Sequence, residues 1–533
     1  MLISLLILLL VLINTVGIGL IVVGLFKTSN ERDLVITSFI GSFVIMLLLA
    51  ITHFFVPINE LTLIPFTLLS CIILYVNRKV DYKLSLSKEF IFLLIIFIFY
   101  LIGKGTQYPS WTDSNLYHAQ VIQWYNKYPI TKGIANLFCA YGLNSFFHLF
   151  AAQYTFLNIS NDPLPNIGIL YFELMFLLFV FSKIQEHTNY ILIIPCWIFV
   201  GYWNWESSPS PDIVVSIIIS IGLIIFSQKK ISIEEHLFCI LSIILIVTIK
   251  QSGAIYSLLI FPYLGFLKPN KKHLYFLLTI TVVTFLTWVP RNLILSGYPL
   301  YPLTIIDFVD LKHQVPKELV NAWTIQITYF ARLPIDSWRE VIGQPFTTWI
   351  PNWFLLHRKT DRLLMIVTLI SLIYSVFIFN KQDNKHKAIL CIIYIGLTFW
   401  IVKTPTMRFG YSYMLMLFTI CLKAILKKKK NTDLIINYSL AIIIIIGISF
   451  SALYYNWKDT IIFPGKYKKT NTNNFLIDQN VFISVPIDDY CKDTAIPCMY
   501  ITPESTLKAF SNKISDGFYQ SHPSEIDIEQ RGY

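Results

Sequence analysis

Residues 2–26 read LISLLILLLVLINTVGIGLIVVGLF, an uninterrupted apolar run of the kind that crosses a lipid bilayer as a helix. The run is too long for the core of a secretory signal peptide, and neither a basic segment nor a small-residue cleavage site flanks it. We therefore interpret it as a helix that the protein retains. Similar apolar runs recur along the chain, separated by polar connectors.

The composition is that of a membrane protein. Of 533 residues, 55% are hydrophobic and 14% are charged, whereas soluble globular proteins carry about a quarter charged residues. The net charge of +11 comes mostly from Lys and Arg in short connectors, so it indicates membrane orientation and not a nucleic-acid partner. Aromatic residues make up 16% of the chain, which is consistent with side chains at membrane interfaces and around a sugar or lipid site.

The apolar runs predict an all-α polytopic membrane protein with about 14 transmembrane helices. Several runs are shorter than the roughly 20 residues that span a bilayer, and the pair at 235–250 and 252–267 is the least distinct. The expected spans are 2–26, 34–56, 60–77, 89–103, 166–182, 189–203, 211–227, 235–250, 252–267, 273–294, 362–380, 386–402, 409–426 and 433–455.

Basic residues mark alternate connectors, which predicts that those connectors are cytoplasmic. The long connectors 104–165 and 295–361 are then outer loops, and both chain termini lie outside a bacterial cytoplasmic membrane. The marking residues are Lys27, Arg32, Arg78, Lys79, Lys83, Lys88, Lys183, Lys229, Lys230, Lys268, Lys271, Lys272, Lys381, Lys385, Lys387, Lys423 and 427–430.

The polar tail at 457–533 contains short strand-like pieces such as Val481–Val485, and we expect a small extracytoplasmic domain. Cys491 and Cys498 are seven residues apart in an oxidising compartment, a spacing that permits a disulfide; two free thiols are the alternative.

In the first outer loop, Asp113, Tyr117 and His118 follow one another at helical spacing, within a stretch that we expect to form helices along the membrane surface. A carboxylate there can accept a proton or hold a metal ion. The alternative is that Asp113 caps the helix that begins at Ser114. His118 is a second candidate base, with a hydrogen-bonded interfacial histidine as its alternative.

A second acidic site lies near the start of another apolar run. Asp212 follows Pro211, so ordinary helix capping is a strong alternative to a catalytic role. Trp205 and Glu206 precede it and are candidate substrate contacts. Two carboxylates on one side of the membrane suit a base-assisted or metal-assisted transfer.

Three cations stand at the outer ends of apolar runs, against the positive-inside trend: Lys250, Arg291 and Arg408. Each alone is explained by a side chain that extends to lipid headgroups. Together they predict a phosphate-binding pocket, because Arg binds oxygen atoms in a bidentate manner and Lys supplies a point charge.

These residues resemble the GT-C superfamily of integral-membrane glycosyltransferases, and more narrowly a family of uncharacterised bacterial multi-pass proteins. The resemblance runs from about residue 89 to the end of the chain. Its motifs are Asp113-x-x-x-Tyr117-His118, 132–137 with 142–145, Ser210-Pro211-Asp212, Arg291 to Pro302 (which includes Asn292 and Tyr298), Arg408-Phe409-Gly410, and Cys491 to Cys498 ahead of Asp516-Gly517-Phe518.

The resemblance implies extra helices over 1–88, a GT-C-like core over 89–456 and the tail over 457–533. It also implies transfer of a sugar from a polyprenyl-phosphate donor to a glycan, lipid or protein acceptor of the cell envelope. Asp113 would be the base, Asp212 a second catalytic carboxylate, and Tyr117, Asn292 and Tyr298 substrate contacts. The superfamily often has two adjacent acidic residues where this chain has only Asp113, so a divalent metal, Mg²⁺ or Mn²⁺, stays open as the cofactor. The rival functions are a flippase of lipid-linked saccharides and a non-catalytic envelope scaffold.

Overall fold

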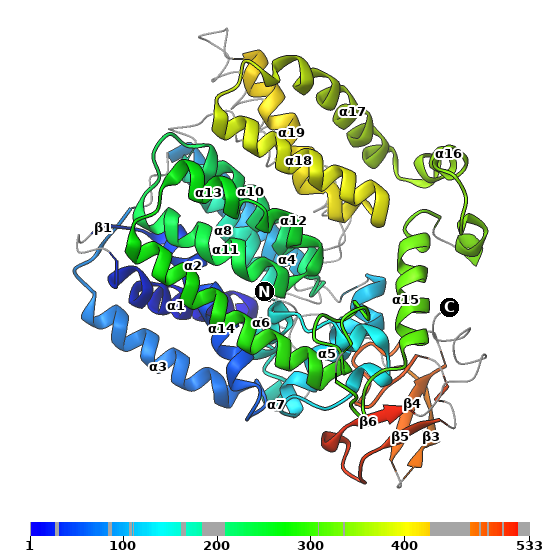
Figure 1. The fold of residues 1–533 in the computed structure, drawn as a ribbon. Helices are drawn as coiled ribbons and strands as arrows, with labels where there is room; N and C mark the ends of the chain where they lie inside the picture. Colours follow the sequence, from blue (N-terminus) through cyan, green and yellow to red (C-terminus); the bar gives the residue numbers. More distant parts are fainter. Residues whose placement is uncertain are drawn as a thin grey trace.

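The structure is a computed structural model, and it is mostly helical (Figure 1). The residues that it describes are 2–26, 31–83, 88–105, 109, 111–160, 167–183, 208–307, 309–333, 336–426, 470–478, 481–487, 490–500, 502–503 and 506–520.

The first of three N-terminal helices, α1 (Leu2–Gly24), packs closely against the other two, α2 (Leu34–Thr52) and α3 (Glu60–Val76). Asp33 caps α2 by accepting a hydrogen bond from the Ile36 amide, and Asn59 caps α3 in a capping box. A Cβ atom at Gly41 would lie 1.7 Å from the Thr15 carbonyl oxygen, so only glycine lets α1 and α2 approach this closely.

The centre of the bundle contains helices that are apolar on all sides. Every residue of α10 from Pro211 to Phe226 is buried, and α11 is buried over most of its length. A helix that is apolar all round lies inside a protein or in a membrane, and these two lie largely against protein. The central helices are α8 (Ile167–Lys183), α10 (Pro211–Ser227) and α11 (Ile233–Ile249), whereas α4 (Lys88–Gly105) packs against α8 and exposes Ile91, Ile95 and Phe99.

The first predicted outer loop forms a compact layer of short helices between α4 and α8. The prediction of helices in this loop is met, although they are interrupted by 3-10 and π turns. They are the π-helix η1 (Ser114–His118), α5 (Ala119–Lys127), η2 (Ile134–Asn136), η3 (Cys139–Gly142), α6 (Phe146–Gln153) and α7 (Leu157–Ser160).

The remaining helices form a long α14, the second predicted outer loop and a three-helix group, α17 to α19. Figure 1 shows that group side by side and α15 standing between α16 and the C-terminal strands. The elements are η6 (Gln251–Gly253), α12 (Ala254–Ser257), α13 (Ile260–Leu267), α14 (Lys271–Ser296), α15 (Lys317–Phe330), η7 (Asp336–Val341), α16 (Phe346–Leu356), α17 (Lys359–Phe379), α18 (Asn384–Lys403) and α19 (Met407–Leu426).

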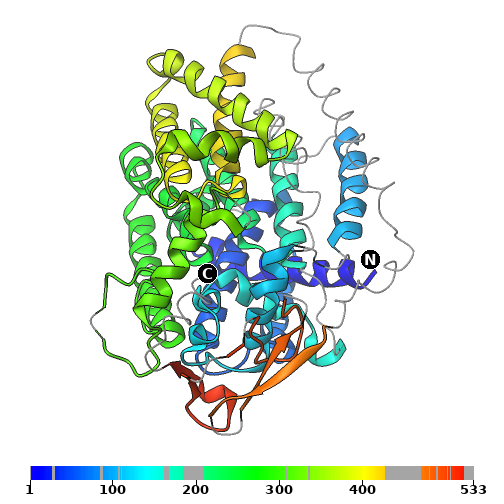
Figure 2. The same ribbon diagram turned by 90° about the vertical axis from the view of Figure 1, so that its right-hand side faces the viewer.

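The tail folds into two small antiparallel hairpins at one end of the bundle (Figure 2), with η10 (Ile514–Asp516) between β5 and β6. It packs on the layer of short helices: the Phe518 amide donates to the Lys132 carbonyl at 3.0 Å, and the Tyr141 hydroxyl donates to the Cys498 carbonyl at 2.9 Å. The strands are β3 (Thr472–Leu476) with β4 (Phe482–Pro486), and β5 (Leu507–Ala509) with β6 (Phe518–Gln520).

The prediction of about 14 spanning helices is too high for the described part of the chain. Five described helices are long and apolar enough to cross a membrane: α1, α2, α14, α17 and α18. Four further apolar stretches are 10 to 17 residues long, and α13 has only eight residues. The sequence pattern overcounts because a fully buried helix and a lipid-facing helix are equally apolar. The expected spans 189–203 and 433–455 lie outside the described residues.

Several of the connectors predicted to be cytoplasmic lie together at one end of the bundle, which we call the basic end. There β1 (Glu31–Asp33) pairs in parallel with β2 (Asp81–Lys83), Lys272 Nζ contacts the Leu25 carbonyl, and Lys385 Nζ donates to the Gln228 carbonyl at 2.8 Å. This grouping is what the positive-inside pattern requires. Which side of a membrane this end faces stays a prediction.

Candidate functional site

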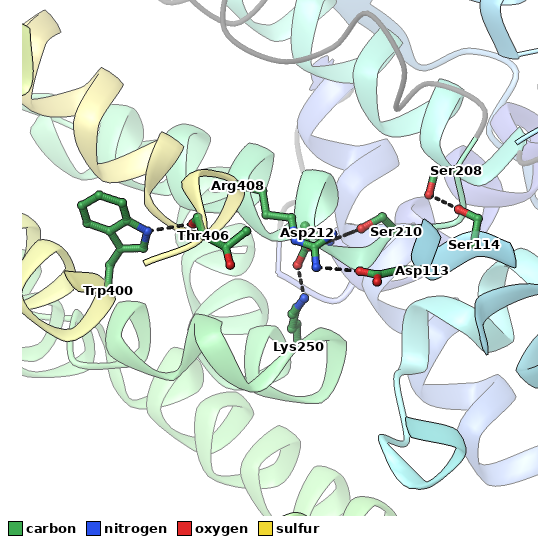
Figure 3. Close-up of polar contacts among 9 residues, drawn as sticks. All are labelled: Asp113, Ser114, Ser208, Ser210, Asp212, Lys250, Trp400, Thr406 and Arg408. Carbon is green, nitrogen blue, oxygen red and sulfur yellow. Dashed lines mark hydrogen bonds and ion pairs between the residues drawn. The ribbon is translucent and has the colours of Figure 1, made fainter. Parts of the chain in front are cut away.

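At the opposite end of α10 and α11 from the basic end, two carboxylates and two cations meet in what we call the charge cluster: Asp113, Asp212, Lys250 and Arg408 (Figure 3). Arg408 Nη2 lies 2.6 Å from Asp113 Oδ2, and Arg408 Nε lies 3.2 Å from Asp212 Oδ2. Lys250 Nζ pairs with Asp212 Oδ1. The structure thus brings together both predicted carboxylates and two of the three predicted cations.

Asp113 immediately precedes the π-helix η1, and its side chain makes no capping hydrogen bond. The capping alternative therefore does not describe this residue. The widened turn closes with the Ala119 amide donating to the Ser114 carbonyl, an arrangement that is often found at functional sites. The Asp113 side chain is 21% exposed, and its ion-pair partner in the structure is Arg408.

Asp212 lies in the first turn of α10, but Ser210 is the residue that caps this helix, accepting a hydrogen bond from the Asp212 amide. The Asp212 carboxylate instead accepts from the Ser210 hydroxyl at 3.1 Å and pairs with the two cations. Its side chain is 2% exposed. A carboxylate this deeply buried needs such partners, because an unpaired buried charge is very costly.

The two cations come from the ends of separate helices. Lys250 follows the last residue of α11, and its ammonium lies 4.2 Å from the centre of the Phe409 ring. Arg408 is in the first turn of α19, preceded by a turn whose carbonyls accept hydrogen bonds from two indoles. Trp400 Nε1 donates to Thr406 at 2.7 Å, and Trp353 Nε1 donates to Pro405 at 3.1 Å. These contacts fix the start of α19 and thereby aim Arg408.

His118 and Tyr117 border the cluster on η1. Burial, and then the negative charges of Asp113 and Asp212, raise the pKa of Tyr117 well above its usual value. Burial, and then His148, Lys250 and Arg408, hold the pKa of His118 well below its usual value, so its imidazole is neutral near pH 7.

Arg291 makes its contacts elsewhere. Its guanidinium is fully buried; Nε donates to Asn144 Oδ1 at 2.9 Å, and Nη1 lies 3.1 Å from His53 Nδ1. Asn292 is part of the same network, accepting from Asn144 at 2.8 Å and donating to the Pro299 carbonyl at 2.9 Å. The predicted grouping of Arg291 with the other two cations is therefore absent from the described contacts, and this motif joins helices instead.

The other predicted residues are spread over the molecule. The Tyr298 hydroxyl donates to the Val315 carbonyl at 2.9 Å, and the side chain is 1% exposed, which places it inside the second predicted outer loop. Cys491 and Cys498 form a disulfide in the tail. Trp205 and Glu206 lie outside the described residues.

Sequence reasoning missed several residues around the cluster. His148 on α6 lies 5.0 Å from His118 between ring centres, Trp111 lies over the Arg408 guanidinium, and the Ser114 hydroxyl is bonded to that of Ser208. Only the spacing of His148 on an amphipathic stretch gave any signal, and that signal does not separate a site histidine from a core histidine.

The donor set does not fit a divalent metal as it stands. Among the described residues no three His, Cys, Asp or Glu side chains gather as ligands, and each carboxylate of the cluster faces a cation.

Comparison with known proteins places the chain in a family. No curated protein and no solved structure matches it. A family model described as a domain of unknown function, DUF8201, matches residues 1–415, which include the three N-terminal helices and the whole charge cluster. Because this match covers more than half of the 533 residues, the chain belongs to the DUF8201 family.

Proposed function

We propose that the protein is a membrane glycosyltransferase that moves a sugar from a polyprenyl-phosphate donor to a cell-envelope acceptor. The observation that carries this proposal is the charge cluster. Replacing a buried ion pair by apolar residues is often neutral or stabilising, so four ionised groups gathered at the ends of four elements call for a reason other than stability. Ionisable side chains whose pKa values are shifted by their surroundings are typical of functional sites.

The two cations supply the chemistry that a lipid phosphate needs. A guanidinium has five N–H donors and an ammonium has three, and the cluster's ion pairs occupy only some of them. Lys250 and Arg408 are 22% and 15% exposed, so the remaining donors are within reach of a phosphate. As the sugar leaves, the growing negative charge on that phosphate is offset by the same two groups.

The acceptor hydroxyl needs a proton acceptor, and the site offers two. Asp113 has one carboxylate oxygen on Arg408 and a second oxygen that can take a proton. His118 is neutral and buried one turn further along. Either group would act as a general base: it would take the proton of the acceptor hydroxyl while the acceptor oxygen bonds to the anomeric carbon and the lipid phosphate leaves.

The test is sugar transfer in proteoliposomes from a panel of radiolabelled polyprenyl-phosphate sugars. We expect Arg408→Ala and Asp212→Asn to abolish a transfer that the unmodified protein performs. The control is Asp383→Asn, which removes a carboxylate paired with His386 at the basic end and should leave transfer intact. Movement of intact lipid-linked sugar between leaflets with no new glycosidic bond would instead establish a flippase. If the protein neither transferred the sugar nor moved the lipid-linked sugar between leaflets, a non-catalytic envelope scaffold would be the remaining function.

A further inference from the structure

Two buried histidines lie side by side next to the charge cluster. His118 ends η1 and His148 lies on α6; their rings are 5.0 Å apart between centres and tilted by 51°. They are 1% and 2% exposed. Within the described part of the chain, both ring nitrogens of His118 and Nε2 of His148 have no hydrogen-bond partner. Buried polar atoms nearly always have partners, so three unpartnered nitrogens in one place point to a group that binds there.

The orientation of His148 is fixed by its own contact. Its ring is hydrogen-bonded to the Pro209 carbonyl, in the segment that leads into Asp212. A carbonyl only accepts, so the bonded nitrogen carries the proton, and in the neutral ring the unpartnered Nε2 carries a lone pair. That lone pair is in the ring that neighbours His118.

We propose that His118 takes the proton from the acceptor hydroxyl and that His148 positions the His118 ring for this step. The inference rests on the proposed glycosyltransferase function, and it decides between the two bases that this function leaves open. Asp113 is the weaker candidate, because its carboxylate is held by Arg408 and protonating it would weaken that ion pair.

The acceptor oxygen forms a bond to the anomeric carbon, and the bond from that carbon to the phosphate oxygen breaks. The electron pair of the broken bond leaves with the lipid phosphate. The hydroxyl proton moves to a ring nitrogen of His118, which becomes an imidazolium, and the phosphate's added charge lies near Lys250 and Arg408.

The charged surroundings suit this role. Burial first, and then His148, Lys250 and Arg408, lower the pKa of His118, which leaves it neutral and able to accept a proton. The other titratable groups that face the pair are Tyr117, whose ring lies 4.2 Å from that of His118 between centres, and Asp212, which acts on His148. An anionic donor bound to the two cations offsets their charge, so the pKa of His118 rises when the donor is in place, toward the range in which a base works well.

The experiment compares transfer by the unmodified protein with that by variants of His118. His118→Asn keeps a polar atom near the Nδ1 position and His118→Gln keeps one near Nε2, so at least one should fold, as judged by its melting temperature. We expect kcat to fall by about 10²- to 10⁴-fold with the KM for the donor little changed, and added imidazole to restore part of the rate in His118→Ala. His386→Gln, at the basic end, is the matched control and should transfer normally.

His148 is tested as a positioning residue. We expect His148→Phe to lower kcat less than the His118 variants do and to move the acid limb of the pH profile of kcat/KM, which a purely structural role would leave in place. Folded His118→Asn or His118→Gln transferring within threefold of the unmodified protein would overturn the inference and leave the proposed function standing. No transfer by the unmodified protein would overturn the proposed function, and this inference with it.

Discussion

The guanidinium of Arg408 bridges Asp113 and Asp212, with Nη2 2.6 Å from the former and Nε 3.2 Å from the latter. One side chain at the start of α19 thereby holds together the π-helix η1 and the first turn of α10. The geometry of the site depends on this bridge, because among the described residues Arg408 is the one ion-pair partner of Asp113, whereas Asp212 also pairs with Lys250.

Replacing Arg408 should uncouple these elements. We expect Arg408→Leu to destabilise the protein by about 3 kcal/mol, since it leaves two carboxylates with Lys250 alone. A double-mutant cycle with Asp113→Leu should give a coupling energy of about 1 to 3 kcal/mol, measured by unfolding in detergent. Additive effects of the two substitutions would show that the 2.6 Å contact contributes nothing.

Local sequence rules located the residues of the site but not their roles. Ser114 begins a helix after Asp113, and Asp212 follows Pro211, so both carboxylates match capping patterns. In the structure Ser210 caps α10, and both carboxylates turn toward Arg408. Whether a residue caps a helix depends on its neighbours in the sequence, whereas these ion pairs depend on where α11 ends and where α19 begins in space.

The lack of spatial information in local sequence patterns also explains why the predicted role of Arg291 and the predicted number of spanning helices differ from the structure. Lys250, Arg291 and Arg408 all stand at ends of apolar runs, and nothing local distinguishes the one that joins helices from the two that meet carboxylates. Likewise α10 and α17 are both strongly apolar, although α10 is buried and α17 exposes much of its surface. The hydrophobic pattern of a helix indicates that its surface is not exposed to water, but it does not indicate whether that surface packs against protein or faces lipid.

We expect the tail to hold α5, and with it the preceding π-helix η1, in place through Gln120 on α5. Its side-chain amide donates to the carbonyls of Lys492 and Thr494 at 3.1 and 2.8 Å, within the loop closed by the disulfide. We expect Gln120→Leu to cost about 2 kcal/mol, because two partly buried carbonyls lose their donor. Hydrogen exchange of the 111–120 backbone should speed up with it.

The control for Gln120 lies on the same helix. Gln123 is also buried, but its amide nitrogen has no partner, so Gln123→Leu should be neutral or stabilising. Equal losses in the two variants would mean that burial, and not the contact with the tail, decides the effect.

Stability should fall in mild acid. Burial above all lowers the pKa of His148 to about 4, below its value of about 6.5 in the unfolded chain. Between these two values the unfolded state binds more protons, so stability is full above pH 6.5 and is lost as the pH falls toward 4. From pH 6.5 to 5 we expect His148 to account for about 2 kcal/mol. The melting temperature of His148→Phe should depend less steeply on pH than that of the unmodified protein, and parallel curves would contradict this.

Arg291 should matter for stability and not for transfer. Its buried guanidinium joins the end of α2 to α14, donating to the Ala50 carbonyl at 3.2 Å as well as to Asn144. Arg291→Met keeps most of the volume but removes these bonds, and we expect a loss of about 2 kcal/mol. Asn144→Ala should produce a similar loss, and the double variant should lose less than the sum, because both residues belong to one network.

Comparing Arg291 and Arg408 variants tests which of the two residues binds the donor phosphate. If only the charge cluster binds the donor phosphate, then folded Arg291→Met keeps the rate and the donor KM of the unmodified protein. Arg408→Lys loses rate, because an ammonium lacks the planar fork that pairs Nε with one carboxylate and Nη2 with the other. A raised donor KM in Arg291→Met with an unchanged melting temperature would give Arg291 the phosphate contact that its place in the sequence suggests. The binding site would then extend from the charge cluster to the junction of α2 and α14.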